Sequence, residues 1–434
     1  MPRYYVIPLN ARATSIHMRV FKFGGASLKD PRSIRNMIDI VRKHGQPPLL
    51  IVVSAMGKST NTLEQVFDYH RKTGMVGPAF DELREYHLRL MRELFEPGNS
   101  VFVAVDVLFE RALHSLQDPH PYDTGYDQII AYGELISSTI VHHLALQEGL
   151  PAIWMDARNF ISTDETFREG KVDWDLTQKK VSALKPVLAD KIVITQGFIG
   201  KAPSGLTTTL GREGSDFSAA IFASLLGARS VTIWKDVPGV MSADPKRLPD
   251  PVVFSELPYQ EAAEMTYYGA SVIHPKTIKP LANAKIPLYV KSFDDPSLPG
   301  TVIHECRIPR LPPLVVFKDN QCLISCRVTD YTFISEQQIS MIFHHLSSLD
   351  IRINVMQNSA ISFSFCIDFR ESRVTALIRE LQKNFEVYYN AGLTLITVKN
   401  YDAESFEKYR KMDGVLLEQV SRSTLQVLVR SNRR

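Results

Sequence analysis

Four apolar segments of this chain end in turns that combine glycine with polar side chains, and this repeated pattern limits the fold more than any other feature. Three of the segments are Arg19–Phe23, Leu49–Val53 and Lys191–Thr195, and the fourth ends at Trp234. Each is apolar enough for a buried strand, and helical segments separate them. This alternation is typical of a parallel sheet in an α/β fold. Open α/β sheets bind ligands where their strands end, so we expect ligand-binding groups in these turns.

The stretch 207–245 carries the most specific of these turns. It places threonines, glycines and the pair Arg212 and Asp216 ahead of an apolar helix, and a further strand then ends at Lys235 and Asp236. Free backbone N–H groups at a loop-to-helix junction can point at a bound phosphate, and the helix dipole favours its charge. The stretch therefore predicts a nucleotide-dependent phosphotransferase.

Two common nucleotide-binding motifs do not account for this site. The segment Lys58-Ser59-Thr60 has the ending of a P-loop, but Val52 stands where that motif requires glycine. The G-x-G-x-x-G fingerprint of dinucleotide-binding folds does not occur in the sequence.

Composition excludes several classes of partner. The net charge of +3 is too small for a nucleic-acid binder. No apolar run approaches the roughly 18 residues of a membrane span, and the N-terminus has no signal-peptide core. Cys322 and Cys326 have C-x3-C spacing, but they lie in an apolar strand-like segment without a nearby histidine. We therefore assign no metal ligand, and we expect core thiols in a reducing compartment and a cytoplasmic protein.

A second folding unit is predicted beyond the proline-rich segment 307–313. Helices at about 335–349 and 371–384 separate four expected strands there. These strands are Gln321–Thr329, Ile353–Gln357, Ala360–Asp368 and Leu393–Lys399. The order βαββαβ predicts a ferredoxin-like α+β module. The helix and two strands expected after residue 400 are too short for a second full copy.

Lys22 is the strongest single candidate for a functional residue. It is the charged residue of a strand that otherwise reads Val20, Phe21 and Phe23, and Gly24-Gly25 follow it directly. A lysine inside a buried strand needs compensation for its charge, so this position favours contact with a phosphate. The alternative is an edge strand that leaves Lys22 in solvent.

Glu134, Arg212 and Asp216 are weaker candidates when taken alone. Glu134 follows Gly133 in a largely apolar helix, where the alternative is an exposed helical glutamate. Arg212 and Asp216 have i,i+4 spacing, so a surface ion pair is the alternative, but the intervening Gly214 favours a loop.

Seven blocks of sequence, taken together, resemble the aspartate kinases of the amino-acid kinase family. The blocks are VFKFGGASLKD, VVSAMGKSTN, YGELISS, ITQGFIG, TTTLGREGSDFSAA, WKDVPGVMSADP and EMTYYGASVIHPKTIKPL. They occur in the family's order over about residues 18–305, and the part from Cys322 onward resembles the ACT domains that follow in that family.

The resemblance implies a fold and a domain plan. The catalytic domain is expected to be a three-layer αβα domain with a mainly parallel sheet, followed by ferredoxin-like α+β ACT modules. The expected parts are an N-terminal extension over 1–17, the amino-acid kinase domain over 18–305, a linker over 306–314 and an ACT region over 315–434. The ACT region is expected to hold one full unit and an abbreviated second.

The resemblance also implies a reaction. The side-chain carboxylate of L-aspartate attacks the γ-phosphate of ATP and gives 4-phospho-L-aspartate and ADP, the first step of lysine, threonine and methionine biosynthesis. A carboxylate with a pKa of about 4 is already ionised at neutral pH, so no general base is required. Repulsion between this anion and the triphosphate must instead be overcome by lysines, backbone N–H groups and Mg²⁺.

Matching positions in the family imply a role for individual residues. Lys22 is expected to bridge the phosphates, and Asp216 to orient the lysines. For the substrate, Arg212 is expected to clamp the α-carboxylate and Glu134 to pair with the α-ammonium, with Thr60 and Ser215 as further contacts. The positions implied for ATP are Lys22, Gly24, Gly25, Lys235, Asp236, Met241, Lys246, Ser271 and Val272.

Three residues depart from the family's pattern. Glu213 replaces a frequent glycine and adds negative charge close to the phosphates. Ser271 stands where many members carry lysine, and Lys276 or Lys235 is a candidate to compensate. Met241 replaces an aromatic residue that can stack on adenine.

The resemblance of the C-terminal part to ACT domains implies how the protein is regulated. Paired ACT units in this family form dimer interfaces that bind lysine or threonine as feedback inhibitors. Because the second unit is abbreviated and lacks a matching glycine-rich effector turn, we expect a homodimer with reduced or absent feedback control. Two alternative functions stay open at this point. One is a kinase of another amino-acid carboxylate such as glutamate, and the other is a catalytically weak amino-acid sensor.

Overall fold

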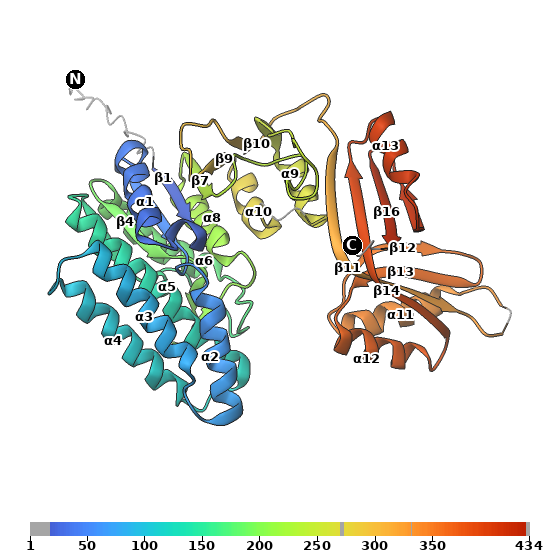
Figure 1. The fold of residues 1–434 in the computed structure, drawn as a ribbon, viewed down its shortest axis with the longest axis horizontal. Helices are drawn as coiled ribbons and strands as arrows, with labels where there is room; N and C mark the ends of the chain where they lie inside the picture. Colours follow the sequence, from blue (N-terminus) through green and yellow to red (C-terminus); the bar gives the residue numbers. More distant parts are fainter. Residues whose placement is uncertain (1–17, 270–272, 331, 431–434) are drawn as a thin grey trace, which may run out of the picture. The chain divides into compact units, whose positions relative to one another are not determined.

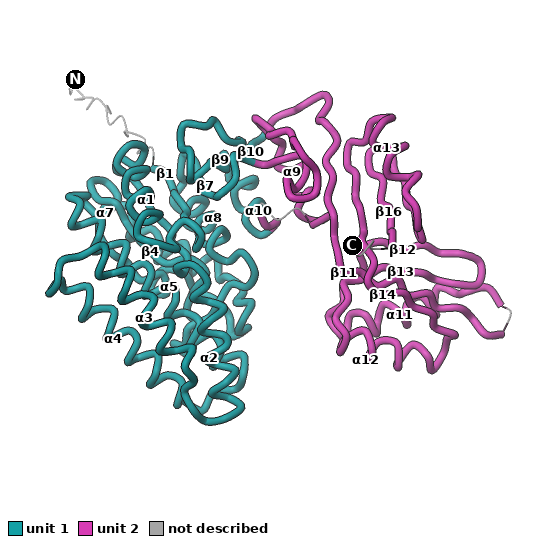
Figure 2. Tube along the Cα trace, viewed as in Figure 1, with its two compact units in different colours: residues 1–239, 276–305 teal, residues 240–275, 306–434 magenta. Residues whose placement is uncertain are grey.

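The computed structural model describes residues 18–269, 273–330 and 332–430 (Figure 1). Their contacts divide the chain into two compact units, drawn in teal and magenta in Figure 2. The first unit ends at Gly239 and resumes over Lys276–Glu305. The second unit consists of Val240–Pro275 and of the chain from Cys306 onward. The N-terminal extension expected over 1–17 lies outside the described residues.

A mainly parallel sheet forms the centre of the first unit. Its strands lie in the order β3-β4-β2-β1-β7-β9-β10, and neighbouring strands are parallel except for β9 with β10. Their bounds are β1 Arg19–Phe23, β2 Leu49–Val53, β3 Ala152–Met155, β4 Ile192–Gln196, β7 Ser230–Lys235, β9 Leu288–Ser292 and β10 Thr301–His304. A separate antiparallel hairpin joins β5 Ile199–Lys201 to β6 Thr207–Thr209. The predicted parallel sheet is confirmed.

Helices cover both faces of this sheet, which makes the first unit a three-layer αβα domain as expected. The helices of the first unit are α1 Pro31–His44, α2 Ser59–Thr73, α3 Pro78–Leu94, α4 Ser100–Leu116, α5 Tyr122–Gln147, α6 Trp174–Val181, α7 Lys185–Leu188, α8 Gly214–Leu226 and, apart from its first residue, α10 Pro275–Asn283. Residues of α1 to α5 form one large core with Phe21, Phe23 and Trp234 of the sheet. Helix α8 contacts β1, β2 and β7.

The alternation of side chains along a strand explains the charged residue in β1. Phe21 and Phe23 point into the core shared with α1 to α5, so Lys22 points to the opposite face. Residue Lys22 is in register with Ile233 of β7, and Lys235 lies two residues further along that strand. Lys22 and Lys235 therefore share the face that α8 covers.

Helix α5 is long and apolar enough to cross a membrane, by length and composition only, which the sequence analysis did not expect. About 72% of its most apolar window is buried inside the protein, where the helix contacts α2, α4 and β4. A buried core helix of a globular domain can have the same length and apolar composition. We therefore draw no membrane assignment from this helix, and no other helix of the described residues meets the criteria.

The second unit contains a six-stranded antiparallel sheet in the order β12-β13-β11-β14-β16-β15. Its strands are β11 Leu314–Arg327, β12 Ile353–Asn358, β13 Ser362–Asp368, β14 Glu386–Lys399, β15 Val415–Val420 and β16 Thr424–Arg430. Its helices are α9 Tyr259–Tyr267, α11 Glu336–Ser348, α12 Glu371–Leu381 and α13 Ala403–Arg410, and the short strand β8 is Glu256–Pro258.

Two long strands, β11 and β14, divide this sheet into two halves. The first half follows the predicted βαββαβ order, but it ends with residues 386–390 and not with Leu393–Lys399, which pair with β16 in the second half. Most side chains of residues 386–392 are exposed, so this segment has no apolar pattern that predicts a strand. In the second half, α13 lies between β14 and β15 in the chain, and α9 contacts the end of β14 through Lys399.

The segment 240–275 belongs to the second unit, although the sequence-based plan places it in the catalytic domain. The backbone N–H of Val315 donates to the carbonyl oxygen of Ser242 at 2.8 Å. The Lys399 ammonium lies 3.2 Å from a carboxylate oxygen of Glu261 and also pairs with Glu264. These contacts connect residues on either side of the predicted boundary at 306.

Candidate active site

The turns that follow β1, β2 and β4 are joined by backbone hydrogen bonds, as expected for parallel strands that end at one edge. The N–H of Ser54 donates to the Phe23 carbonyl at 3.1 Å, and the N–H of Gly57 donates to the Gly25 carbonyl at 3.0 Å. The N–H of Gly197 donates to the Val53 carbonyl at 2.9 Å. The glycine turns identified in the sequence therefore converge.

Close packing explains two of the glycines. A Cβ atom on Gly25 would lie 2.7 Å from the Ala55 carbonyl oxygen, which is backbone and cannot move aside. A Cβ atom on Gly197 would lie 2.4 Å from Cβ of Ser215, at the start of α8. Both residues permit a close approach of neighbouring segments. The second glycine lets the N-terminus of α8 pack directly against the end of β4.

Asp216 lies between two lysines at this edge of the sheet. Its Oδ1 is 2.6 Å from Nζ of Lys22, and its Oδ2 is 3.5 Å from Nζ of Lys235. The Asp216 side chain is fully buried, and Lys22 and Lys235 expose 10% and 18% of their side chains. Burial raises the pKa of Asp216, but the charges of Lys22 and Lys235 lower it by a larger amount. The pKa of Asp216 therefore lies below its ordinary value. Asp216 is thus an anion that holds two cations side by side.

Glu213 adds a second carboxylate to this cluster. Its Oε2 lies 3.9 Å from Nζ of Lys235, and its side chain is 28% exposed. Burial, and to a smaller extent the neighbouring Asp216, raise the pKa of Glu213 despite the nearby lysines. The sequence predicted negative charge here but not the contact with Lys235. Glu213 has a left-handed backbone, with φ +56°, where glycine is free of strain.

Glu134 occupies a buried position on α5. Its side chain is almost completely removed from solvent, and its Oε2 has no hydrogen-bond partner among the described residues. Burial raises the pKa of Glu134 to about 8, although the Ala55 backbone and the Lys22 charge oppose the shift. A buried carboxylate oxygen without a partner is a suitable acceptor for a ligand ammonium group. The alternative of an exposed helical glutamate is wrong.

The other residues proposed for the substrate lie on the same turns. Ser215 is buried in the first turn of α8, and Thr60 is half-buried in the first turn of α2. Arg212 is exposed, and within the described ranges no ion pair involves its guanidinium. The alternative of an Arg212–Asp216 surface pair is therefore wrong, because Asp216 is buried against the lysines. Asp236 follows β7 and is exposed.

Four of the residues implied for the nucleotide cannot be placed with this cluster. Met241 and Lys246 belong to the second unit, where Met241 forms an isolated β-bridge with Val253 and Lys246 is exposed. Ser271 and Val272 lie outside the described residues.

Asp127 is a structural residue of this site that the sequence analysis missed. Its carboxylate accepts hydrogen bonds from the Thr209 N–H and hydroxyl at 2.8 and 2.7 Å and from the Arg168 N–H at 2.8 Å. These bonds fix the strand that leads to Arg212. Asp127 precedes Glu134 by seven residues on α5, and this spacing of two acids on one face of an apolar helix is the signal that could have found it.

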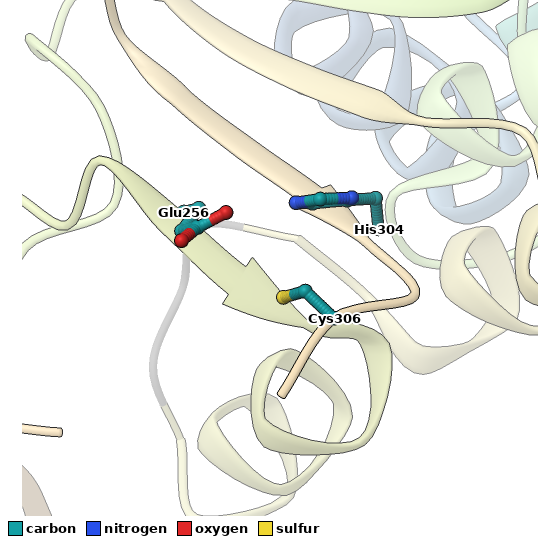
Figure 3. Close-up of side chains that lie close together, drawn as sticks. All are labelled: Glu256, His304 and Cys306. Carbon is teal, nitrogen blue, oxygen red and sulfur yellow. The ribbon is translucent and has the colours of Figure 1, made fainter. Parts of the chain in front are cut away.

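The cysteines are free thiols, and three of them are buried in the second unit. Burial raises the pKa of Cys322 to about 11 and those of Cys326 and Cys366 to about 12. Cys306 approaches Glu256 of the same unit, and burial and this carboxylate raise its pKa (Figure 3). His304, also drawn there, belongs to the first unit. These thiols are therefore protonated at neutral pH when no metal ion is bound.

Comparison with known proteins adds independent information. The model of the amino acid kinase family matches residues 17–292. The chain is 30% identical over 397 residues to lysine-sensitive aspartokinase 3 of Escherichia coli K12, covering 88% of this chain and 87% of that protein. It is 31% identical over 397 residues to a chloroplastic bifunctional aspartokinase/homoserine dehydrogenase 2 of Arabidopsis thaliana, covering 86% of this chain but 42% of that protein. The chain thus spans less than half the length of this bifunctional relative.

A solved structure is similar along nearly the whole chain. It is E. coli aspartokinase III in complex with aspartate and ADP, with 27% sequence identity and a TM-score of 0.82. The match covers 95% of this chain and 96% of that chain. At this coverage the similarity extends into both compact units.

Proposed function

The chain belongs to the amino acid kinase family and, within it, to the aspartokinases, and from this premise we propose that it transfers the γ-phosphoryl group of ATP to the side-chain carboxylate of L-aspartate. The product is 4-phospho-L-aspartate. The observation that carries the proposal is the pair of lysines, Lys22 and Lys235, held side by side by the buried Asp216. The similar E. coli enzyme has been solved with aspartate and ADP.

The charges of this cluster suit the reaction. Two anions, the aspartate carboxylate and the γ-phosphate, must approach each other, and repulsion between them is the main barrier that the protein can lower. The positive charges of Lys22 and Lys235 offset this repulsion where the strands end. The acceptor carboxylate is ionised at neutral pH, so the chemistry requires no general base.

We assign the phosphate end of the site to Lys22, Lys235, Asp236 and the backbone of Gly24 and Gly25. Lys22 bridges the phosphates, and Asp216 orients both lysines. The half-buried glycines bring their backbone N–H groups close to the ligand, and a Cβ on Gly24 would lie 3.4 Å from Nζ of Lys22. Met241, Lys246, Ser271 and Val272 remain proposals for the nucleotide on the basis of the family pattern alone.

We assign the aspartate end to Arg212, Glu134, Thr60 and Ser215. Arg212 is exposed and makes no ion pair within the described ranges, so its guanidinium is available for the substrate α-carboxylate. Glu134 offers a buried carboxylate oxygen without a partner, which suits the α-ammonium. Thr60 and Ser215 lie in the first turns of α2 and α8 and offer hydroxyl groups.

Mg²⁺ fits this site as the companion of the nucleotide. Asp216 already contacts two lysines, so its oxygens are not free to hold a metal. Phosphate oxygens and water are the usual ligands of Mg²⁺ in such sites, and bound there the ion supplies further positive charge to the phosphates. We assign no protein carboxylate to it.

We propose further that the protein is cytoplasmic and forms a homodimer through its ACT region. Buried free thiols such as Cys322 and Cys366 are compatible with a reducing compartment. Sensitivity to lysine is a property named for the E. coli relative. For this chain we propose weak or absent control by lysine and threonine, because the sequence after residue 393 lacks a glycine-rich effector turn that matches the family's pattern.

One assay separates the proposed function from its alternatives. The protein is incubated with ATP, Mg²⁺ and either aspartate or glutamate, and hydroxylamine traps the acyl phosphate. We expect trapped product in the reaction with aspartate and none in the reaction with glutamate. Product with glutamate would indicate a different amino-acid kinase, and measurable amino-acid binding without any product would indicate a sensor.

A further inference from the structure

Glu213 has a backbone conformation that residues other than glycine rarely adopt. Its φ is +56° and its ψ is +26°, in the left-handed region where glycine is free of strain, and α8 begins at the next residue. A glutamate at such a position is unfavourable unless the side chain makes a useful interaction. The backbone aims this side chain at Lys235, which lies 3.9 Å from its Oε2.

The charged groups that face Glu213 come from three different elements. They are Lys235 of β7, Lys22 of β1 and Asp216 of α8, all of which contribute to its electrostatic environment. Of these four described groups, the two carboxylates balance the two ammonium charges before any ligand binds. Without Glu213, the same cluster would carry one net positive charge for the phosphates.

In the proposed function, Lys235 must bind the nucleotide phosphates as well as the carboxylates of the protein. It already contacts Asp216 at 3.5 Å and Glu213 at 3.9 Å, and a phosphate oxygen that binds Lys235 must compete with both carboxylates. Asp216 is fully buried and also holds Lys22 at 2.6 Å, so it is fixed in place. Glu213 has the longer contact and the more exposed side chain, so it is the partner that a phosphate displaces.

Once displaced, the Glu213 carboxylate lies beside phosphate charge without its cation. Protonation removes this repulsion, and the group is already predisposed to it because burial raises its pKa whereas the net pKa of Asp216 is lowered. We infer that nucleotide phosphates displace Glu213 from Lys235 and that Glu213 takes up a proton as they bind. The proton comes from solvent buffer, bonds to a carboxylate oxygen of Glu213 and returns to solvent when the nucleotide leaves.

This inference rests on the proposed function, because it requires a nucleotide at this site. Its test is titration calorimetry of the full chain with ADP and Mg²⁺ at neutral pH, in two buffers with different enthalpies of ionisation. If a proton is taken up, the apparent binding enthalpy differs between the buffers by the uptake multiplied by the difference in ionisation enthalpy. We expect uptake of a fraction of a proton and weaker ADP binding as pH rises.

The variant Glu213→Gln identifies the group that takes up the proton. Glutamine keeps the size of the side chain and the strain of the backbone, but it cannot titrate or pair with Lys235. We expect the buffer-dependent proton uptake to disappear, because ADP phosphates bound by lysines and Mg²⁺ release protons and do not take them up, and we expect ADP to bind about twofold to fivefold more tightly. Glu148→Gln is the matched control, because Glu148 pairs with Arg42 on the surface of the same unit, and it should behave like the natural protein.

The outcomes of this experiment distinguish failure of the proposed function from failure of the inference about Glu213. No binding of ADP to the natural chain would refute the proposed function itself. Binding with the same enthalpy in both buffers would overturn the inference and leave the function standing. Equal proton uptake by the natural protein and by Glu213→Gln would overturn it too, because the proton would then go to another group.

Discussion

Lys22 and Asp216 meet at 2.6 Å on the face of the sheet covered by α8, and both are almost completely removed from solvent. A buried lysine and a buried aspartate compensate each other's desolvation, and removing one partner leaves an uncompensated charge. The same arrangement leaves Asp216 close enough to hold Lys235. The pair therefore connects the stability of the first unit with the positive charge that the reaction requires.

Replacement of Lys22 by methionine tests the role of this cation. We expect turnover to fall by about 10²-fold or more, since a charge aimed at the transition state is lost. Steady-state kinetics with aspartate and ATP measure the effect, and circular dichroism checks the fold. The control is Lys29→Met, seven residues further along and exposed, which should retain activity. A Lys22→Met protein with near-normal turnover would remove Lys22 from the mechanism.

Glu134→Gln tests the ammonium site through the pH dependence of stability. The pKa of Glu134 is raised to about 8 in the folded state, so between its ordinary value and 8 the folded protein binds more protons than the unfolded one. Glu134 therefore destabilises the fold increasingly as pH rises through this range. Each unit of pKa shift corresponds to about 1.4 kcal/mol, and the pKa rises from 4.5 to about 8, so the effect by pH 8 is on the order of 4 to 5 kcal/mol. Thermal unfolding at several pH values should show Glu134→Gln more stable at about pH 8 and equal near pH 5.

The substrate provides the second readout for Glu134. Aspartate should raise the melting temperature of the natural protein, because its α-ammonium compensates the buried carboxylate, and Glu134→Gln should lose most of this shift. A variant that is less stable at every pH, or that aspartate still stabilises fully, would contradict the assignment of Glu134 to the ammonium group.

Strain at Glu213 can be measured separately from its charge. Glycine at this left-handed position relieves about 1–2 kcal/mol of backbone strain and costs about 0.5–1 kcal/mol of extra chain entropy. We therefore expect Glu213→Gly to stabilise the protein by roughly 0.5–1 kcal/mol in urea unfolding. Lys285→Gly is the matched control, because Lys285 also has positive φ, at +55°, but lies on the surface of the same unit. A gain in Lys285→Gly without one in Glu213→Gly would mean that the carboxylate stabilises the lysine cluster.

Sequence reasoning found the centre of this site because the relevant signals are local. A lysine in an apolar strand requires compensation of its charge, and Lys22 meets Asp216. The glycines directly after it indicate close packing, and Gly25 packs against the Ala55 carbonyl. The contact between Glu213 and Lys235 could not be predicted, because these residues are far apart in the sequence and meet only in the fold. Asp127 was missed because its partners, Thr209 and Arg168, are far from it in the sequence.

Burial explains which strands the sequence revealed. Strand β2 is buried throughout, and its apolar run predicted it with correct bounds. The first half of β14 pairs only with β11 and is mostly exposed, so its composition does not distinguish it from a loop. The grouping of residues 240–275 with the second unit depends on contacts such as Glu261 with Lys399, which no local pattern contains.

Feedback control is tested by titrating lysine and threonine, separately and together, in the kinase assay. We expect little inhibition at sub-millimolar concentrations, because the sequence after residue 393 lacks a glycine-rich effector turn that matches the family's pattern. The E. coli lysine-sensitive relative, assayed in parallel, is the positive control. Strong inhibition of this chain by either amino acid would refute the proposal of weak control.

The ion pairs of Lys399 should hold α9 against the antiparallel sheet of the second unit. The Lys399 side chain is 4% exposed, and its ammonium group contacts both Glu261 and Glu264, whose side chains are 24% and 38% exposed. Burial lowers the pKa of Lys399, but Glu264 and Glu261 together raise it above the ordinary value, so the lysine is charged at neutral pH.

Lys399→Met removes this cation, and we expect the free energy of unfolding to fall by about 1–3 kcal/mol. This loss is less than for a fully buried pair, because water reaches both glutamates. Hydrogen exchange should accelerate in α9, whereas Lys383→Met, which breaks the surface pair with Glu380, should change neither stability nor exchange. If the loss comes from the unpaired carboxylates, adding Glu261→Gln and Glu264→Gln to Lys399→Met should restore most of the stability, and a further loss would show that these glutamates stabilise α9 in another way.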